Sequence, residues 1–198
     1  MILLCTASDN YIKKYKSCII SQQEYCNRNN YKYILIQGTL KSRNWKRAKI
    51  EELHSIIDTT DDDILLIDGD CYIKNNCPPL DNFLNKDKSI YYANGKSGRL
   101  NSGFLYFKNN LESKNFVREL LKKLEKPVPR GRGYFVTKEG ENGHIIWLKD
   151  EYEKALKNIF QEIPKLWNCS SPILEKEAYV LHFTNDLKKG IHRYNEGL

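Results

Sequence analysis

Two patterns of hydrophobic and polar residues recur along the first third of the chain. Short apolar runs typical of strands lie at residues 2–6, 31–36 and 64–67. Between them, apolar residues recur every three or four positions over 12–26 and 45–58, as they do on one face of a helix. The run 64–67 contains no polar residue, which predicts a strand buried on both faces within a mostly parallel sheet. This order of elements predicts an α/β fold with helices on both faces of a central sheet.

The remaining two thirds of the chain continue these patterns with one interruption. Strands are predicted at 89–93, 102–107 and 179–183, and helices around 116–124 and at 144–158. The segment 126–143 is instead rich in glycine and carries several cations. Because loops of this length in compact domains are often functional, it is a candidate lid over the substrates, the alternative being an ordinary solvent loop. No repeat or change of composition divides the chain, so we expect one domain over residues 1–198.

Composition narrows the class of protein. The chain has 198 residues, enough to bury a core without disulfides or structural metals, and its six cysteines are expected to be reduced. Its 32 Lys and Arg against 25 Asp and Glu give a net charge of +7, which favours anionic partners and allows peripheral contact with an anionic membrane. The basic residues are not clustered, so nucleic acid is not expected as a partner. Because no membrane-spanning run or secretory signal is visible, we expect a cytoplasmic protein.

Two carboxylates, Asp68 and Asp70, stand at the end of the buried run, separated by Gly69. Ligands of open α/β sheets bind beyond the carboxyl ends of the strands, which is where these residues are predicted to lie. Because glycine allows a tight turn, both carboxylates can converge on one hard cation, Mn²⁺ or Mg²⁺, which can in turn hold the phosphates of a substrate. Acids around a glycine are also common in ordinary turns, which is the alternative interpretation.

Six segments, including this one, resemble in their order the motifs of the GT-A class of nucleotide-sugar glycosyltransferases. Within that class they resemble glycosyltransferase family 8, which contains glycogenin and bacterial lipopolysaccharide galactosyltransferases. The segments are the D-x-D motif Asp68–Asp70 together with Ala7–Tyr11, Arg47–Lys49, Asn101–Leu105, Trp167–Asn168 and His182–Lys188. They span nearly the whole chain, and the resemblance implies a GT-A (Rossmann-like) fold.

The resemblance also implies roles for particular residues. The cation would be bound by Asp68, Asp70 and His182. Residues that would bind the nucleotide sugar are Thr6, Ala7, Asn10, Tyr11, Arg47, Asp68 and Lys188. In this set Tyr11 would stack on the base and Lys188 would reach the diphosphate. Residues that would lie near the donor sugar and its reacting carbon are Asn101, Glu141 and Asn142.

Three other features have simpler interpretations. Lys49 is expected on the surface of its helix, where charged side chains are usually solvated. Trp147 lies at helical spacing, which is more typical of a core residue than of an acceptor platform. The three aspartates at 61–63 are expected to form a solvated turn rather than a second metal site.

Together these features predict a metal-dependent glycosyltransferase that moves a hexose from a nucleotide diphosphate sugar, expected to be UDP-linked, to a hydroxyl of a glycan or protein. The resemblance to family 8 favours retention of the anomeric configuration. One alternative is a sugar-1-phosphate nucleotidylyltransferase, although such enzymes usually carry a glycine-rich basic loop where this chain has Ala7–Tyr11. The other alternative is a non-catalytic sugar- or nucleic-acid-binding module.

Overall fold

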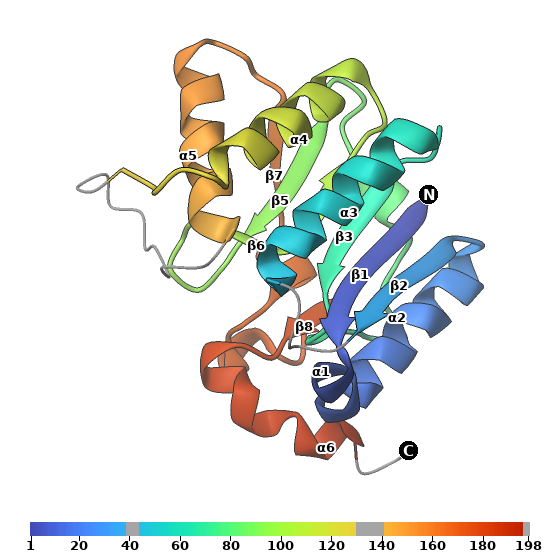
Figure 1. Cartoon of the computed structure of the whole chain (residues 1–198). Coiled ribbons are helices and arrows are strands. Elements are labelled where there is room, and N and C mark those ends of the chain that lie inside the picture. Colours follow the sequence, from blue (N-terminus) through green and yellow to red (C-terminus); the bar gives the residue numbers. More distant parts are fainter. Residues whose placement is uncertain (39–43, 130–140, 196–198) are drawn as a thin grey trace.

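A six-stranded sheet forms the centre of the computed structural model, which describes residues 1–38, 44–129 and 141–195. The strands follow the spatial order β2-β1-β3-β6-β5-β7 (Figure 1). Their bounds are Ile2–Ser8 (β1), Lys32–Gly38 (β2), Ile64–Asp68 (β3), Ile90–Asn94 (β5), Leu100–Phe107 (β6) and Phe160–Ile163 (β7). β6 is antiparallel to both of its neighbours, whereas the other pairs are parallel. The predicted mostly parallel α/β sheet is confirmed.

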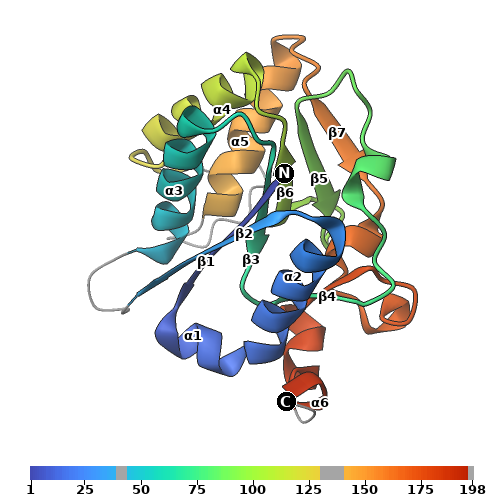
Figure 2. The same cartoon turned by 90° about the vertical axis from the view of Figure 1, so that its right-hand side faces the viewer.

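Helices cover both faces of this sheet, as predicted (Figures 1 and 2). Side chains alternate between the faces along each strand. On β1, Leu3 packs in a core with α2 (Lys16–Asn29), while Leu4 packs in a second core with the other three long helices. Those helices are α3 (Trp45–Thr59), α4 (Leu111–Lys123) and α5 (Glu141–Lys154). Residues 64–67 are fully buried between the two layers, which explains their unbroken apolar run.

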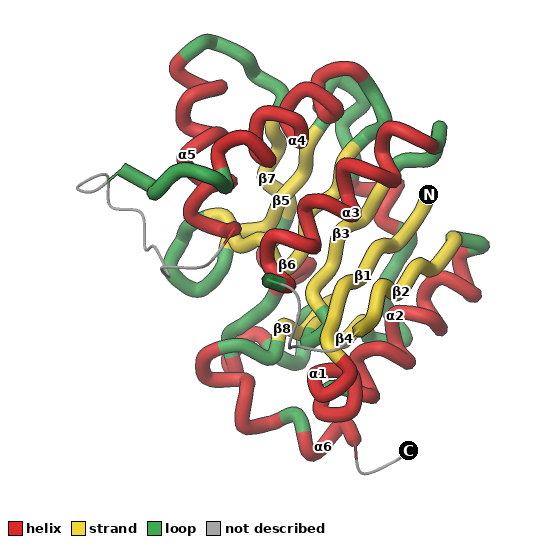
Figure 3. The backbone as a smooth tube through the Cα atoms, viewed as in Figure 1, coloured by secondary structure: helices red, strands yellow, loops and turns green. Residues whose placement is uncertain are grey.

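A smaller layer lies beyond the carboxyl ends of the parallel strands. It contains α1 (Asp9–Lys14), α6 (His192–Asn195) and a two-stranded antiparallel sheet of β4 (Cys71–Ile73) and β8 (Val180–His182). The 3₁₀ helices are η2 (Leu80–Phe83), η3 (Lys165–Asn168), η4 (Pro172–Leu174) and η5 (Asn185–Gly190). Figure 3 shows this layer below the main sheet. The strand predicted at 179–183 therefore exists, but it pairs with β4 rather than with the main sheet.

Some predicted segments begin or end at other residues in the structure, and some expectations stay predictions. α5 begins at Glu141, so the last residues of the predicted 126–143 loop are helical, and 130–140 lie outside the described residues. The six cysteines are buried free thiols, in agreement with the expectation. Over the described ranges, no helix combines the length and apolarity needed to cross a membrane. The division into a single domain stays a prediction.

Candidate active site

The carboxyl ends of β1 and β3 open into a cavity of about 250 Å³. The two strands are paired in parallel register, which sets Thr6 opposite Asp68. The cavity is lined by Thr6, Ala7, Ser8, Tyr11, Lys46, Lys49, Asp68, Gly69 and Glu141. Its position agrees with the general location of ligands in open α/β sheets.

Next to this cavity, two carboxylates and an imidazole converge. The pairing of β4 with β8 sets Cys71 opposite His182 and thereby brings His182 beside Asp70. His182 Nε2 lies 3.3 Å from Asp70 Oδ1 and 3.8 Å from Asp68 Oδ2. Asp70 and His182 are buried. The Oδ1 atom of Asp70 faces His182 Nε2 but has no partner in hydrogen-bond geometry among the described residues. A buried carboxylate oxygen without a well-aligned donor is costly, so this atom is suited to bind a cation.

A hydrogen bond fixes the orientation of the His182 ring. The amide nitrogen of Asn168 donates to the backbone and side-chain oxygens of Asn101, both at 3.2 Å, so Oδ1 of Asn168 is the atom that faces His182. His182 Nδ1 donates to this oxygen at 2.9 Å, which directs Nε2 toward the carboxylates. Burial lowers the pKa of His182, but the charges of Asp70 and Asp68 outweigh it and raise that pKa above its ordinary value. An imidazole oriented through its second nitrogen is typical of metal ligands.

Two neighbours shape this cluster without supplying a ligand. The Sγ atom of Cys71 lies close to Asp70 and His182, but it donates to the backbone oxygen of Gly103 at 3.4 Å. Burial and the charge of Asp70 raise the pKa of the Cys71 thiol, which therefore stays protonated. At Gly103, a Cβ atom would lie 2.2 Å from Cε1 of His182, so only glycine leaves room for the ring. With the thiol excluded, Asp70 and His182 remain of these three residues, and Asp68 Oδ2 lies 3.8 Å from the imidazole. Carboxylate and imidazole donors suit a divalent cation such as Mn²⁺ or Mg²⁺.

Lys49 corrects the expectation from the sequence. Its side chain is only 4% exposed rather than lying on the helix surface. Its Nζ atom donates to Asp68 Oδ1 at 2.6 Å, to the backbone oxygen of Ser102 at 2.7 Å and to Glu141 Oε1 at 3.1 Å. Lys49 stands four residues before the buried Leu53, so helical periodicity alone could have placed it on the inner face of α3.

Ser102 connects the start of α5 to the sheet. Its backbone N–H donates to Asn142 Oδ1 at 2.8 Å, and its hydroxyl donates to Glu141 Oε1 at 2.9 Å. Burial raises the pKa of Glu141, but the charge of Lys49 outweighs it and holds that pKa below its ordinary value. By contrast, burial dominates at Asp68 and raises its pKa, although Lys49 acts in the opposite direction. Lys49 thus connects Glu141 to Asp68 of the D-x-D motif, which the sequence did not predict.

The residues expected to bind the nucleotide divide into two groups. Thr6, Ala7, Tyr11 and Asp68 line the cavity. The Tyr11 ring lies over Gly69, where an added Cβ atom would be 3.3 Å from Tyr11 Cδ1.

The other three expected nucleotide-binding residues lie outside that lining. Arg47 forms ion pairs with Glu51 at 2.8 Å and Glu125 at 3.4 Å. Asn10 and Lys188 are solvent-exposed. Their roles stay predictions, and Lys46 is an additional lining residue.

The remaining predictions concern side chains around this region. Asn101 accepts a hydrogen bond from the backbone N–H of Gly103 at 2.8 Å and lies beside Asn168 rather than in the lining of the cavity between β1 and β3. Trp147 is half-buried, with the Lys123 ammonium 3.8 Å from its ring centroid. Within 61–63, Asp63 accepts a hydrogen bond from the backbone N–H of Asn109 at 2.7 Å, which gives it a structural role in the turn.

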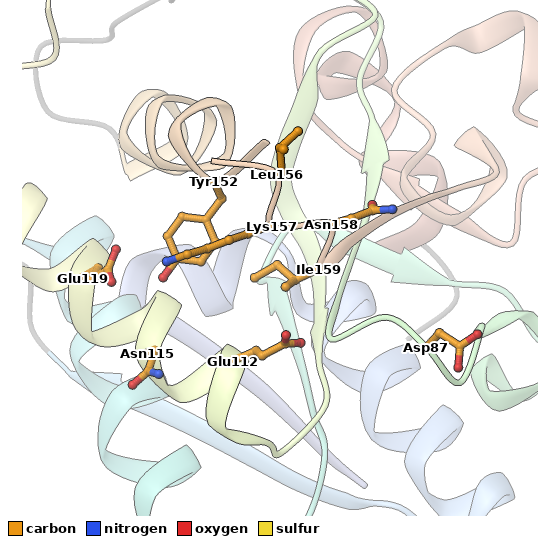
Figure 4. Close-up of a pocket in the computed structure, with 9 residues that line it drawn as sticks. All are labelled: Asp87, Glu112, Asn115, Glu119, Tyr152, Leu156, Lys157, Asn158 and Ile159. Atoms are coloured by element: carbon orange, nitrogen blue, oxygen red, sulfur yellow. The ribbon is translucent and has the colours of Figure 1, made fainter. Parts of the chain in front are cut away.

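A larger cavity, of about 390 Å³, lies at the opposite end of the sheet (Figure 4). Asp87 and Ile159 in its lining precede β5 and β7, so it is at the amino ends of these parallel strands. Its labelled side chains point in different directions rather than toward one centre (Figure 4). Neither its position nor its geometry is that of an α/β active site.

Comparison with known proteins gives structural but not sequence matches. No protein-family model and no curated protein matches the sequence. A glycosyltransferase involved in the glycosylation of the major capsid of PBCV-1 is similar over 98% of both chains, with a TM-score of 0.72 and 12% identity. The glycosyltransferase GlyE of Streptococcus pneumoniae TIGR4 is similar over 98% of this chain and 59% of its own, with a TM-score of 0.59 and 14% identity.

The galactosyltransferase LgtC, solved with donor and acceptor sugar analogs, is similar over 99% of this chain and 94% of its own. Its TM-score is 0.55 and its identity 12%. At these identities the likeness concerns the arrangement of helices and strands, which agrees with the sheet and layers described above. The chain therefore has the GT-A fold of these glycosyltransferases.

Proposed function

We propose that the chain is a metal-dependent glycosyltransferase that moves a hexose from a UDP-sugar to an acceptor hydroxyl. The observation that carries the proposal is the convergence of Asp68, Asp70 and His182 at the edge of the cavity, where one buried oxygen of Asp70 faces the imidazole without a partner in hydrogen-bond geometry among the described residues. The GT-A fold of glycosyltransferases of known structure supports the same reaction class.

Mn²⁺ or Mg²⁺ would be held by these three residues. When bound, the cation supplies positive charge for the donor diphosphate and for the charge that grows there as the sugar leaves. Asn168 keeps the Nε2 atom of His182 directed at the site by accepting from Nδ1. Lys49 holds the Asp68 carboxylate from the opposite side, so that its second oxygen stays toward His182.

The nucleoside would occupy the cavity beside this cluster. Tyr11, whose ring forms one wall, offers an aromatic face for the base, and Thr6 and Ala7 line the ribose side. Asn10 and Arg47 belong to the proposed donor site through the resemblance rather than through cavity contacts. Lys188, which is exposed on η5, would approach the diphosphate.

In the transfer, the bond between the anomeric carbon and the diphosphate oxygen breaks. A new bond forms between that carbon and the acceptor oxygen, and the hydroxyl proton leaves with the nucleotide diphosphate or to solvent. Glu141, Asn142 and Asn101 are the proposed polar groups near the sugar, with retention of configuration. Because Lys49 keeps Glu141 ionised, its carboxylate can accept hydrogen bonds from sugar hydroxyls.

The test is a panel of nucleotide sugars assayed for hydrolysis with and without Mn²⁺. We expect cation-dependent hydrolysis of a UDP-sugar by the wild type and its loss in Asp70→Asn. The matched control is Asp87→Asn, an exposed aspartate at the opposite end of the sheet, which should behave as the wild type. Hydrolysis of none of the sugars, or full activity of Asp70→Asn, contradicts the proposal.

A further inference from the structure

The β5–β6 hairpin lies beside the start of α5 (Figure 1). Two cavities are lined by residues of this hairpin and of α5. Their volumes are about 110 Å³ and 190 Å³. Both are lined by Arg99, Leu100 and Ile146, so they adjoin each other, and together they are here called the hairpin groove. Of its lining residues, the donor-binding role proposed above uses only Asn101 and Asn142.

The hairpin groove adjoins the donor cavity through two consecutive residues. Glu141 lines the donor cavity, and Asn142 lines the groove. Ser102 donates hydrogen bonds to both, so the first turn of α5 is held in place between the two spaces. A molecule in the groove would therefore reach the transferred sugar at Asn142.

The groove follows one face of α5. Asn142, Ile146 and Asp150 are spaced four residues apart and all belong to its lining. Eight residues of helix extend about 12 Å, which is longer than one sugar ring. The hairpin forms the opposite wall, and its turn is closed by hydrogen bonds from Gly95 N–H to the Arg99 oxygen at 2.8 Å and from Gly98 N–H to the Gly95 oxygen at 3.0 Å.

The lining carries amides and paired charges rather than free charges of one sign. Asn94, Asn101 and Asn142 contribute side-chain amides. Two of the lining cations already have carboxylate partners. Lys96 forms an ion pair with Asp186, and Lys149 forms one with Glu153 at 2.6 Å. Groups that can both donate and accept hydrogen bonds match hydroxyls, which also do both.

An apolar side accompanies these polar groups. Leu100 and Ile146 line both parts of the groove, and the Tyr92 ring lines the outer part, with the Lys149 ammonium 5.1 Å from its centroid. Sugars present apolar C–H faces as well as hydroxyls. A peptide that bound by adding a strand would instead need an open strand edge, and here β5 and β6 are each paired on both sides.

We propose that the hairpin groove binds the acceptor, and that this acceptor is a glycan chain of more than one sugar residue. Its terminal hydroxyl would lie near Asn142, and its following sugars would extend along α5 toward Tyr92. The proposal rests on the proposed function, because it names the acceptor of the same reaction. It chooses a glycan over a protein, which the sequence left open.

The test measures hydrolysis of the donor and transfer to acceptors in the same preparation. The full chain, with Mn²⁺ and the UDP-sugar that it hydrolyses, is applied to an array of oligosaccharides and to an array of serine- and threonine-containing peptides. On the best glycan, Arg99→Ala and Tyr92→Ala should each raise the acceptor KM about tenfold, equal to about 1.4 kcal/mol of binding. Ser97→Trp, an exposed change at the rim that keeps the core intact, should lower the ratio of transfer to hydrolysis by a similar factor.

Arg118→Ala is the matched control, because Arg118 is exposed on α4 and outside the groove. It should leave both activities as in the wild type. Hydrolysis without transfer to any glycan, transfer to peptides only, or an unchanged ratio in all three groove variants overturns the groove proposal while the donor chemistry stands. Absence of any donor hydrolysis overturns the proposed function, and the groove proposal with it.

Discussion

Replacing Lys49 by methionine tests how much its ion pairs with Asp68 and Glu141 stabilise the fold. Methionine keeps most of the length of the side chain but leaves Asp68 and Glu141 without their shared cation. Removing one partner of a buried ion pair costs about 3–5 kcal/mol. The Asp68 side chain is 30% exposed and can be solvated in part, whereas that of Glu141 is 8% exposed. We therefore expect a loss near the lower limit, about 3 kcal/mol, or roughly 6–12 °C in Tm for a chain of this size.

The assay is urea unfolding of the metal-free chain followed by tryptophan fluorescence, with the midpoint and slope fitted together. Adding Glu141→Gln to Lys49→Met removes the unpaired buried charge and should restore at least about 1 kcal/mol. Lys122→Met, an exposed lysine on α4, is the control and should change stability by less than about 0.5 kcal/mol. A loss below about 1 kcal/mol for Lys49→Met, or a double variant no more stable than the single one, refutes the reasoning.

Three further predictions concern cation and nucleotide binding. Gly103→Ala should abolish Mn²⁺ binding measured by electron paramagnetic resonance, because its Cβ would lie 2.2 Å from the His182 ring. Gly98→Ala is strained by a φ of +73° but meets no atom within 4 Å, and it lies in an exposed turn away from the cluster, so it should bind Mn²⁺ normally. Since the pKa of His182 is raised, protons should compete with Mn²⁺ at Nε2. The affinity for Mn²⁺ should therefore increase with pH and level off above that pKa. An Mn²⁺ affinity that is constant between pH 5 and about 8 argues against the imidazole as a ligand. Tyr11→Ala should weaken UDP binding in calorimetry about tenfold through loss of the aromatic face, whereas Tyr11→Phe, which keeps the ring, should bind UDP as the wild type does. An equal loss in the two variants would contradict a base-stacking role.

The sequence predicted the centre of the fold because burial there is complete. Residues 64–67 are enclosed on both faces, so their composition alone identified the strand and the position of Asp68. It did not predict that β6 runs antiparallel, since a strand pattern carries no direction. β7 (Phe160–Ile163) was missed because it is short, polar at its two central positions and placed at the edge of the sheet.

Only part of the site was predicted, because only some of its contacts join residues that are close in the sequence. Asp68 and Asp70 are neighbours in the chain, so their convergence is local. The contact between Lys49 and Glu141 joins residues 92 positions apart, and no local pattern encodes it. A lysine on a helix is usually solvated, and that general tendency gave the wrong prediction here.

The position of His182 also depends on a pairing of two strands that the sequence pattern does not reveal. β4 has only three residues, and its pairing with β8 is what brings the imidazole to Asp70. Asn168 was noted only as part of a resembling motif. Its task of orienting His182 Nδ1 became visible only in the structure.

The central claim is that Asp68, Asp70 and His182 hold a divalent cation that binds the diphosphate of a nucleotide. A crystal structure of the chain with UDP and Mn²⁺, analysed by anomalous diffraction at the manganese edge, tests it most directly. We predict one strong anomalous peak bonded to Asp68, Asp70 and His182 and to the phosphate oxygens of UDP. A peak at another place, or UDP bound with no manganese beside these residues, would contradict the claim.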